Sequence, residues 1–313
     1  MNATPTPKRC ATGRHKGRAV NEVFRGVFTA LATPMAVDGS LDEGAFTRHV
    51  QRQVAGGVRG LVPMGTTGES PTLTHEEHGR VVALCVKAAE GRVPVMAGAG
   101  SNCTREAVNM ARFAHQAGAD ALLVAVPYYN KPTQEGLYAH YMAIADATPL
   151  PLWIYCIPGR SVVDVSVETM ARLARHPNIA GTKDATADLT RPIAVRRAVG
   201  AGFNQLSGED GSALSFRAAG GHGCISVTAN VAPELCQRLH DLWEEGKLEE
   251  AIALQDKLTP LHDALFAETS PGPVKYAIAK LGFGAPCLRL PLVAPRPATQ
   301  ARLDAAMAAL GLV

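Results

Sequence analysis

Short apolar runs and longer helix-like stretches alternate along the chain from residue 27 onward. Eight runs rich in Val, Ile, Leu and Ala have the length of buried strands, and they cover residues 27–33, 58–64, 93–99, 121–127, 151–156, 179–185, 203–209 and 223–229. The stretches between them, such as 76–90 and 104–119, repeat apolar residues at three- and four-residue spacing, which is typical of amphipathic helices. Such an alternation predicts a parallel sheet covered by helices. Eight units favour a closed (β/α)8 TIM barrel over a doubly wound open sheet.

The same pattern indicates where the chain divides. Residues 24–232 are expected to form the barrel core, and residues 1–23 a basic leader that is either disordered or a targeting segment. Residues 233–313 are predicted to hold the eighth helix and a C-terminal helical extension, with helices over 233–245, 247–267, 272–281 and 298–310. Thr74 and Thr133 each precede a helical pattern, so we expect them to be N-caps.

Composition and charge narrow the classes of function. Apolar residues make up 47% of the 313-residue chain and charged residues 19%, with no run near the roughly 20 apolar residues of a membrane span. Residues 1–21 hold five of the 31 basic residues, so the remainder has 26 against all 28 acidic ones, and a nucleic-acid-binding face is not expected.

The cysteines indicate the compartment. There are seven, an odd number, and none forms a C-x-x-C pair, so neither a disulfide framework nor a zinc site is expected. The histidines of "HEEH" at 75–78 are three residues apart, not four as in the metalloprotease motif. We therefore expect a cytoplasmic protein without a metal site.

Lys183 stands out near the end of the sixth apolar run, "IAGTKDA". In a barrel of this kind, chemistry takes place at the carboxyl ends of the strands. Burial would lower the pKa of Lys183 from about 10.4, and a neutral amine attacks carbonyl carbon to form a Schiff base. The alternative is a lysine paired with a carboxylate, but neighbouring side chains on a strand point to opposite faces, so Asp184 is a poor partner.

Other polar groups follow other predicted strands. Gly65–Gly68, with Thr66 and Thr67, could hold a carboxylate or phosphate, or be an ordinary glycine-rich turn. Tyr129 and Tyr155 could relay protons or merely line the mouth of the barrel. Arg160 could bind a substrate carboxylate or form a surface salt bridge. Together these groups predict a site at one end of the barrel.

Several of these segments resemble one family. "GTTGESPTL", "PYYNKPTQEGLY", "GTKDATADL", "LSGEDGSAL" and "GGHGCISVTANV" are similar, in order and spacing, to the signature segments of the dihydrodipicolinate synthases. These enzymes belong to the pyruvate-dependent aldolases and lyases that use a lysine. The resemblance runs from about Phe24 to the C-terminus.

The resemblance implies a lyase that condenses pyruvate with L-aspartate 4-semialdehyde to 4-hydroxy-tetrahydrodipicolinate, in lysine and diaminopimelate biosynthesis. It implies a homotetramer built from two tight dimers and no cofactor. It assigns the Schiff base to Lys183, the pyruvate carboxylate to Thr67 with Thr66, the proton relay to Thr66, Tyr155 and the Tyr129 of a neighbouring subunit, the aldehyde's carboxylate to Arg160, and the lining of the pyruvate pocket to Gly208 and Ile225.

In some members of the family L-lysine binds at the tight-dimer interface and inhibits. The positions that match this regulatory site are Ser70, His75, His78, Asn102, Glu106 and Tyr128. Each carries a side chain suited to an amino acid ligand, and the alternative is a set of ordinary polar interface residues.

The chain departs from the family at two positions, where Cys156 replaces the usual Asn and Gly159 replaces the usual Pro or Ser. Alternation should turn Cys156 away from Tyr155, whereas Gly159 should loosen the loop that aims Arg160. Two other functions stay open: a sister pyruvate lyase acting on a sugar acid or sialic acid, and a non-catalytic small-molecule sensor on a barrel scaffold.

Overall fold

The computed structural model describes residues 8, 9 and 15–313, and its eight strands follow the predicted order. They are β1 Gly26–Ala30, β2 Gly60–Val62, β3 Met96–Gly98, β4 Ala121–Ala125, β5 Leu152–Cys156, β6 Ile179–Asp184, β7 Asn204–Ser207 and β8 Gly223–Ser226. Round the sheet the order is β2-β1-β8-β7-β6-β5-β4-β3, and a parallel bridge from Leu61 of β2 to Val95, next to β3, joins its ends. This cyclic order is that of a (β/α)8 TIM barrel and excludes the doubly wound alternative.

Several strands are shorter than their apolar runs. β2 covers three residues of the predicted 58–64. Pro63 follows it and has no N–H to donate, and Met64 takes a left-handed φ of 59°, so regular pairing ends there. Apolar side chains therefore continue past the last residue that can pair.

Helices separate the strands and follow the last one. They are α1 Val20–Val23, α2 Glu43–Ala55, α3 His75–Ala89, α4 Thr104–Gln116, α5 Gln134–Asp146, α6 Pro158–Ser161, α7 Val167–Leu173, α8 Arg191–Val199, α9 Ala213–Ala218, α10 Pro233–Glu244, α11 Leu248–Leu265, α12 Gly272–Lys280 and α13 Pro297–Ala309, with short 3₁₀ turns η2 Thr66–Gly68, η3 Ser70–Thr72 and η4 Thr228–Asn230. Both predicted N-caps are confirmed. Thr74 forms a capping box with Glu77, and the Thr133 hydroxyl accepts the Gly136 amide.

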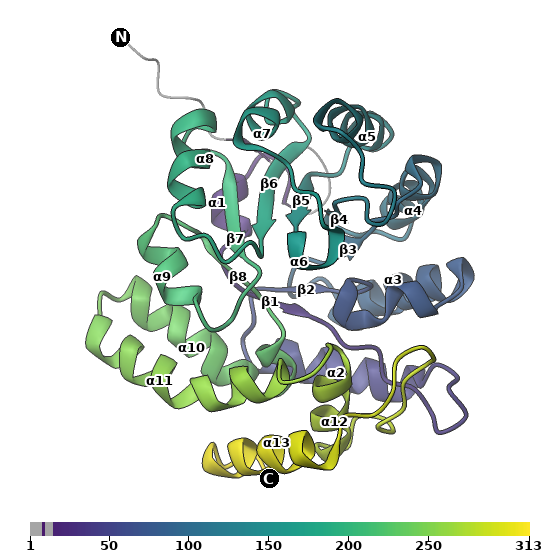
Figure 1. The fold of residues 1–313 in the computed structure, drawn as a ribbon, viewed down its shortest axis with the longest axis vertical. Coiled ribbons are helices and arrows are strands. Elements are labelled where there is room, and N and C mark those ends of the chain that lie inside the picture. The colour runs from purple at the N-terminus through teal and green to yellow at the C-terminus, as the bar shows by residue number, and fades with distance from the viewer. Residues whose placement is uncertain (1–7, 10–14) are drawn as a thin grey trace. The chain divides into compact units, whose positions relative to one another are not determined.

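The chain divides into two compact units, the first of which joins the described residues up to Arg25 to Met96–Cys224. Within it, β3 to β7 pair in parallel, and α4, α5, α7 and α8 pack successively side by side (Figure 1). Every residue of β5 and β6 is buried, so both strands lie in the core of this unit.

The second unit joins Gly26–Val95 to Ile225–Val313. Here α2 packs on α3, and α11 packs against α10 and α13, while α10 also packs on β1 (Figure 1). In the part of the chain that the structure describes, no helix has the length and apolar character needed to cross a membrane.

Part of the predicted leader is described, and it includes Lys8. Its Nζ donates to the carbonyls of Ala174 at 2.8 Å and His176 at 2.9 Å, and also to the carbonyl of Ile179. These carbonyls follow α7 and open β6. Lys8 thus satisfies backbone acceptors at the strand that carries Lys183.

Candidate active site

Lys183 and Tyr155 lie side by side on neighbouring strands. They are register partners in the β5–β6 pair, and the Lys183 Nζ lies 4.1 Å from the centroid of the Tyr155 ring. Lys183 is 5% exposed and Tyr155 6%. The amine is therefore held almost out of water against an aromatic ring whose hydroxyl can carry a proton.

Gly208 closes the space beside Lys183. Its amide donates to the Asp184 carbonyl at 2.6 Å. A Cβ placed on Gly208 would lie 2.7 Å from the Ala185 Cβ and 3.0 Å from the Lys183 Cε. Only glycine fits here without moving the lysine side chain, so this position shapes the surroundings of the amine.

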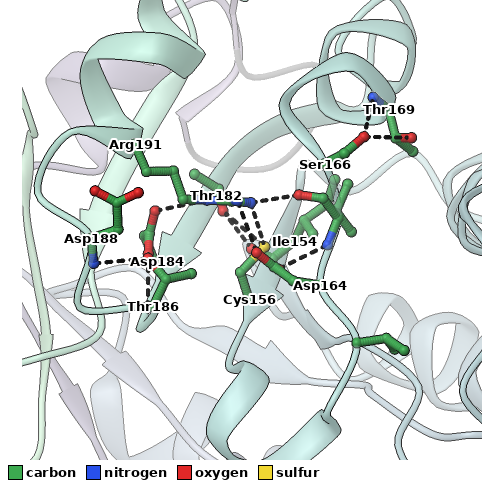
Figure 2. A network of polar contacts seen from close by, with 12 residues as sticks. Ile154, Cys156, Asp164, Ser166, Thr169, Thr182, Asp184, Thr186, Asp188 and Arg191 are labelled. Atoms are coloured by element: carbon green, nitrogen blue, oxygen red, sulfur yellow. Dashed lines mark hydrogen bonds and ion pairs between the residues drawn. The ribbon is translucent and has the colours of Figure 1, made fainter.

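A buried polar network lies at the ends of the same two strands (Figure 2). Strand alternation places its members Cys156 and Asp184 on the face opposite to Tyr155 and Lys183. Arg191, at the start of α8, pairs with Asp184 through Nε at 3.2 Å and with Asp164 through Nη1 at 2.8 Å. Its Nη2 donates to the Val165 carbonyl at 2.6 Å and lies 3.5 Å from the Cys156 Sγ. One guanidinium therefore joins the ends of β5 and β6 to the segment after α6.

Cys156 points into this network and away from Lys183, as strand alternation predicts. Its sulfur also lies 3.9 Å from the Thr182 hydroxyl. Burial raises the pKa of the Cys156 thiol, so it remains protonated at neutral pH. The cysteine acts here as a small buried group beside Arg191.

Arg160 lies on α6, four residues before Asp164, and is exposed. The turn that carries it is fixed by Ser161, whose hydroxyl donates to the carbonyls of Ile157 at 2.9 Å and Val163 at 2.7 Å. A Cβ on Gly159 would meet nothing within 4 Å. The space around residue 159 therefore has room for a larger side chain than that of glycine.

Tyr129 follows β4 in an unusual conformation. Its φ is 68°, in the left-handed region that larger residues rarely adopt, and the residue is 89% exposed. The neighbouring Tyr128 is 41% exposed. The backbone therefore presents both tyrosines outward from the first unit.

Thr66 and Thr67 belong to the second unit, in η2 after β2. Thr67 is buried, and Thr66 is half-buried. The Thr33 hydroxyl at the end of β1 donates to the Gly68 carbonyl at 2.8 Å. Ile225, also of this unit, is fully buried in β8. Both predicted carboxylate-binding threonines thus lie in a turn that is fixed from a neighbouring strand.

The candidate regulatory residues fall in both units. In the first, the Glu106 carboxylate accepts the Ser101 hydroxyl at 2.8 Å, and the Asn102 carbonyl accepts the Asn130 side chain at 2.9 Å. In the second, Ser70 is half-buried in η3, and His75 is exposed whereas His78 is buried, both in the first turn of α3. The two histidines therefore differ in access to a ligand although they lie one helical turn apart.

Glu209 is a candidate that the sequence pattern did not single out. Burial raises the pKa of its carboxyl, the charge of Asp210 adds to the rise, and the charge of Lys183 opposes it. It lies two residues after the end of β7, within the quoted segment "LSGEDGSAL". The sequence could have indicated Glu209 by its position next to Gly208, close to the end of a strand. No group of three metal-ligating side chains occurs among residues 8, 9 and 15–313.

Comparison with known proteins identifies the family. The model of the dihydrodipicolinate synthetase family matches residues 23–310. The 4-hydroxy-tetrahydrodipicolinate synthase of Gluconobacter oxydans is 64% identical over 295 residues, which are 94% of this chain and 99% of that protein.

Solved structures agree with this match. The chloride-inhibited dihydrodipicolinate synthase of Acinetobacter baumannii complexed with pyruvate is 41% identical, with a TM-score of 0.90 over 92% of this chain and 99% of that one. The enzyme of Cyanidioschyzon merolae with lysine bound is 36% identical, with a TM-score of 0.90 over 93% and 99%. With the family model covering nearly the whole chain, the chain belongs to the dihydrodipicolinate synthetase family.

Proposed function

We propose that the chain is a lyase that condenses pyruvate with L-aspartate 4-semialdehyde to 4-hydroxy-tetrahydrodipicolinate, in the route to diaminopimelate and lysine. The observation that carries the proposal is the buried Lys183 amine, 4.1 Å from the centre of the Tyr155 ring. Relatives that bear the synthase name over nearly the full length support the same reaction.

The first half of the reaction takes place on Lys183. Its amine attacks C2 of pyruvate, and loss of water gives an imine. The imine draws electrons from the methyl group, which loses a proton and leaves an enamine. Thr67 with Thr66 holds the carboxylate of pyruvate, and backbone groups of Gly208 and Ile225 line the pocket.

The second half joins the two substrates. The enamine carbon attacks the aldehyde carbon, whose oxygen takes a proton and becomes the 4-hydroxyl. Tyr155, Thr66 and the partner copy's Tyr129 relay that proton, while Arg160 holds the carboxylate of the aldehyde. The amino group of the new chain then attacks the imine carbon and releases Lys183, so one water is lost overall.

Borohydride trapping tests the covalent step. Incubation with pyruvate and borohydride should reduce the imine to a stable adduct, and peptide mass spectrometry should find it on Lys183. Lys183→Arg should fold but trap nothing, because a guanidinium does not deprotonate at working pH. An adduct on another lysine would refute the assignment. Sugar-acid aldehydes assayed in parallel distinguish the sister-lyase alternative.

Oligomerisation belongs to the same proposal. We expect a homotetramer of two tight dimers in the cytoplasm, with Tyr129 entering the partner's site. Its outward conformation and 89% exposure support this role. Mixing the inactive variants Lys183→Arg and Tyr129→Phe should restore part of the activity, since hybrid dimers hold one site with both groups intact. Mixtures as inactive as the parents would contradict a shared site.

L-lysine is the proposed regulator, at Ser70, His75, His78, Asn102, Glu106 and Tyr128. The lysine-bound relative from Cyanidioschyzon merolae supports this choice. Binding has to favour a less active state for inhibition to follow. Initial rates should fall as L-lysine rises to millimolar levels, and Glu106→Ala should lose this response. If the initial rate of the wild-type enzyme does not change with L-lysine concentration, the regulatory proposal is refuted and the catalytic one is unaffected.

A further inference from the structure

Glu69 and Lys275 form an ion pair whose two side chains are buried. Glu69 directly follows η2, and Lys275 lies in α12 of the C-terminal extension. The Lys275 ammonium donates to the Glu69 Oε1, and the two side chains are 1% and 0% exposed respectively. With no access to solvent, neither group can touch a substrate, so any part they take in the reaction is indirect.

Glu69 is held by more than its ion pair. Its Oε2 accepts the Arg289 backbone amide at 3.2 Å and the Thr72 hydroxyl at 3.3 Å. Its backbone adopts φ 57° and ψ 32°, a left-handed conformation that is costly for a residue with a side chain. Such a conformation persists only where the surroundings impose it, and here the surroundings are Thr72 and two residues of the C-terminal extension, Lys275 and Arg289.

Thr66 and Thr67 are the part of the fold that this arrangement can control. They lie two and three residues before Glu69, in the single turn of η2. The Thr33 hydroxyl binds the Gly68 carbonyl from one side, and Lys275 and Arg289 bind the Glu69 carboxylate from the other. Gly68, the last residue of η2, and Glu69, which follows it, are therefore both fixed by hydrogen bonds from other segments.

Packing alone does not call for this ion pair. Moving two charges out of water costs more than an apolar pair of the same size would, and a buried pair is often replaceable without loss of stability. What apolar side chains cannot supply is a directional contact that imposes one backbone conformation on Glu69. The pair therefore serves the geometry of the turn.

We propose that Glu69 and Lys275 are positioning residues that set η2 so that Thr66 and Thr67 bind the carboxylate of the 2-oxo acid substrate. The inference rests on the proposed function of these threonines. It gives the C-terminal extension an indirect role in the active site, through Lys275 of α12. It concerns the carboxylate of pyruvate, which is assigned to these threonines, and not that of the aldehyde, which is assigned to Arg160.

The test is Lys275→Met, which keeps most of the length of the side chain and leaves the Glu69 charge without its ammonium partner. Each preparation is titrated by borohydride trapping at saturating pyruvate, so that rates refer to competent sites only. We expect KM for pyruvate to rise about ten- to a hundredfold, the range that small misplacements of binding groups produce. KM for L-aspartate 4-semialdehyde should stay within about twofold of wild type, well inside that range.

Two further variants separate positioning from a general loss of structure. Glu69→Gln/Lys275→Met removes both charges and should recover much of the pyruvate affinity that the single variant loses. Lys280→Met, in the same helix but at a side chain that is 45% exposed, should leave both KM values unchanged. If Lys275→Met does not fold, the isosteric Glu69→Gln serves in its place and should raise KM for pyruvate alone.

Three results overturn the inference: an unchanged KM for pyruvate per competent site, an equal rise in both KM values, or a double variant no better than the single one. Wild-type enzyme that failed to trap pyruvate on Lys183 would instead refute the proposed function. The two failures are thus distinguishable in one set of preparations.

Discussion

Replacing Arg191 with methionine removes the guanidinium at the centre of the network in Figure 2. The substitution keeps most of the aliphatic side chain but breaks the pairs with Asp184 and Asp164 and the contact with the Val165 carbonyl. The Asp184 side chain is 3% exposed, so its carboxylate would stay out of water without a cation. Asp164, at 21%, has some access to solvent.

The expected loss in free energy of unfolding follows from the burial of Asp184. Removing one partner of a buried ion pair costs about 3–5 kcal/mol, because the remaining charge is left uncompensated. Asp184 keeps the amide of Thr186 at 2.9 Å and its hydroxyl at 2.7 Å on the other carboxylate oxygen. The loss in free energy of unfolding should therefore lie at the lower end, about 3 kcal/mol at neutral pH.

The pH dependence separates charge from packing. Burial already raises the pKa of Asp184 above 3.8, and the Arg191 charge opposes the rise. A carboxyl with a raised folded pKa favours the folded state at low pH, and this contribution is lost as pH rises through that pKa. Without Arg191 the pKa of Asp184 rises further. The loss in free energy of unfolding should therefore be largest at pH values above the pKa that Asp184 has in the variant, and it should shrink as Asp184 takes up a proton.

Urea unfolding followed by circular dichroism, from about pH 5 to about pH 8, measures both quantities. Arg197→Met is the control, since Arg197 lies on the same helix and is exposed. Arg191→Lys should fall between the variant and wild type, because it keeps the charge but not the fork geometry. A deficit of the same size at every pH would show that lost packing, not an unpaired carboxylate, weakens the protein.

Three other expectations concern single side chains. Arg160→Ala should leave pyruvate trapping intact and slow condensation about ten- to 150-fold at low aldehyde, through loss of a charge-assisted contact worth about 1.5–3 kcal/mol; unchanged turnover would show that Arg160 points elsewhere. Gly159→Ala should raise the free energy of unfolding by about 0.4–1 kcal/mol, because its Cβ has open space and φ is not in the left-handed region; a loss in urea melts would contradict this. Lys8→Met should cost about 1.5–3 kcal/mol of stability by freeing three carbonyls, against no change for the exposed Lys16→Met.

Local patterns in the sequence were sufficient for the barrel and for the direction in which Cys156 points. Apolar runs and helical periodicity predicted the strands, and strand alternation correctly predicted that Cys156 points away from Tyr155. Arg191 and Lys275 gave no comparable signal, because each is a helix residue whose partner lies on another element. Lys275 meets Glu69 across 206 positions of the chain. Such pairs depend on how elements dock, which neighbouring residues do not encode.

The register between β5 and β6 shows how one local irregularity fixes the chemistry. Leu152 pairs with Ile179, but Trp153 pairs with Gly181, so β6 contains one extra residue at this point. A Cβ on Gly181 would lie 2.4 Å from the Trp153 Nε1 and 2.4 Å from the Asn204 carbonyl oxygen.

Glycine therefore permits the shift, and the shift determines which side chains meet. Without it, Tyr155 would face Thr182, and Lys183 would stand opposite Cys156. With it, Tyr155 pairs with Lys183 on one face, and Cys156 pairs with Asp184 on the other. Because a one-residue slip would exchange the two faces, the Arg191 network can form only in the register that brings the lysine to the tyrosine. Contacts on the face that carries Cys156 and Asp184 thus also hold Tyr155 and Lys183 in place on the other face.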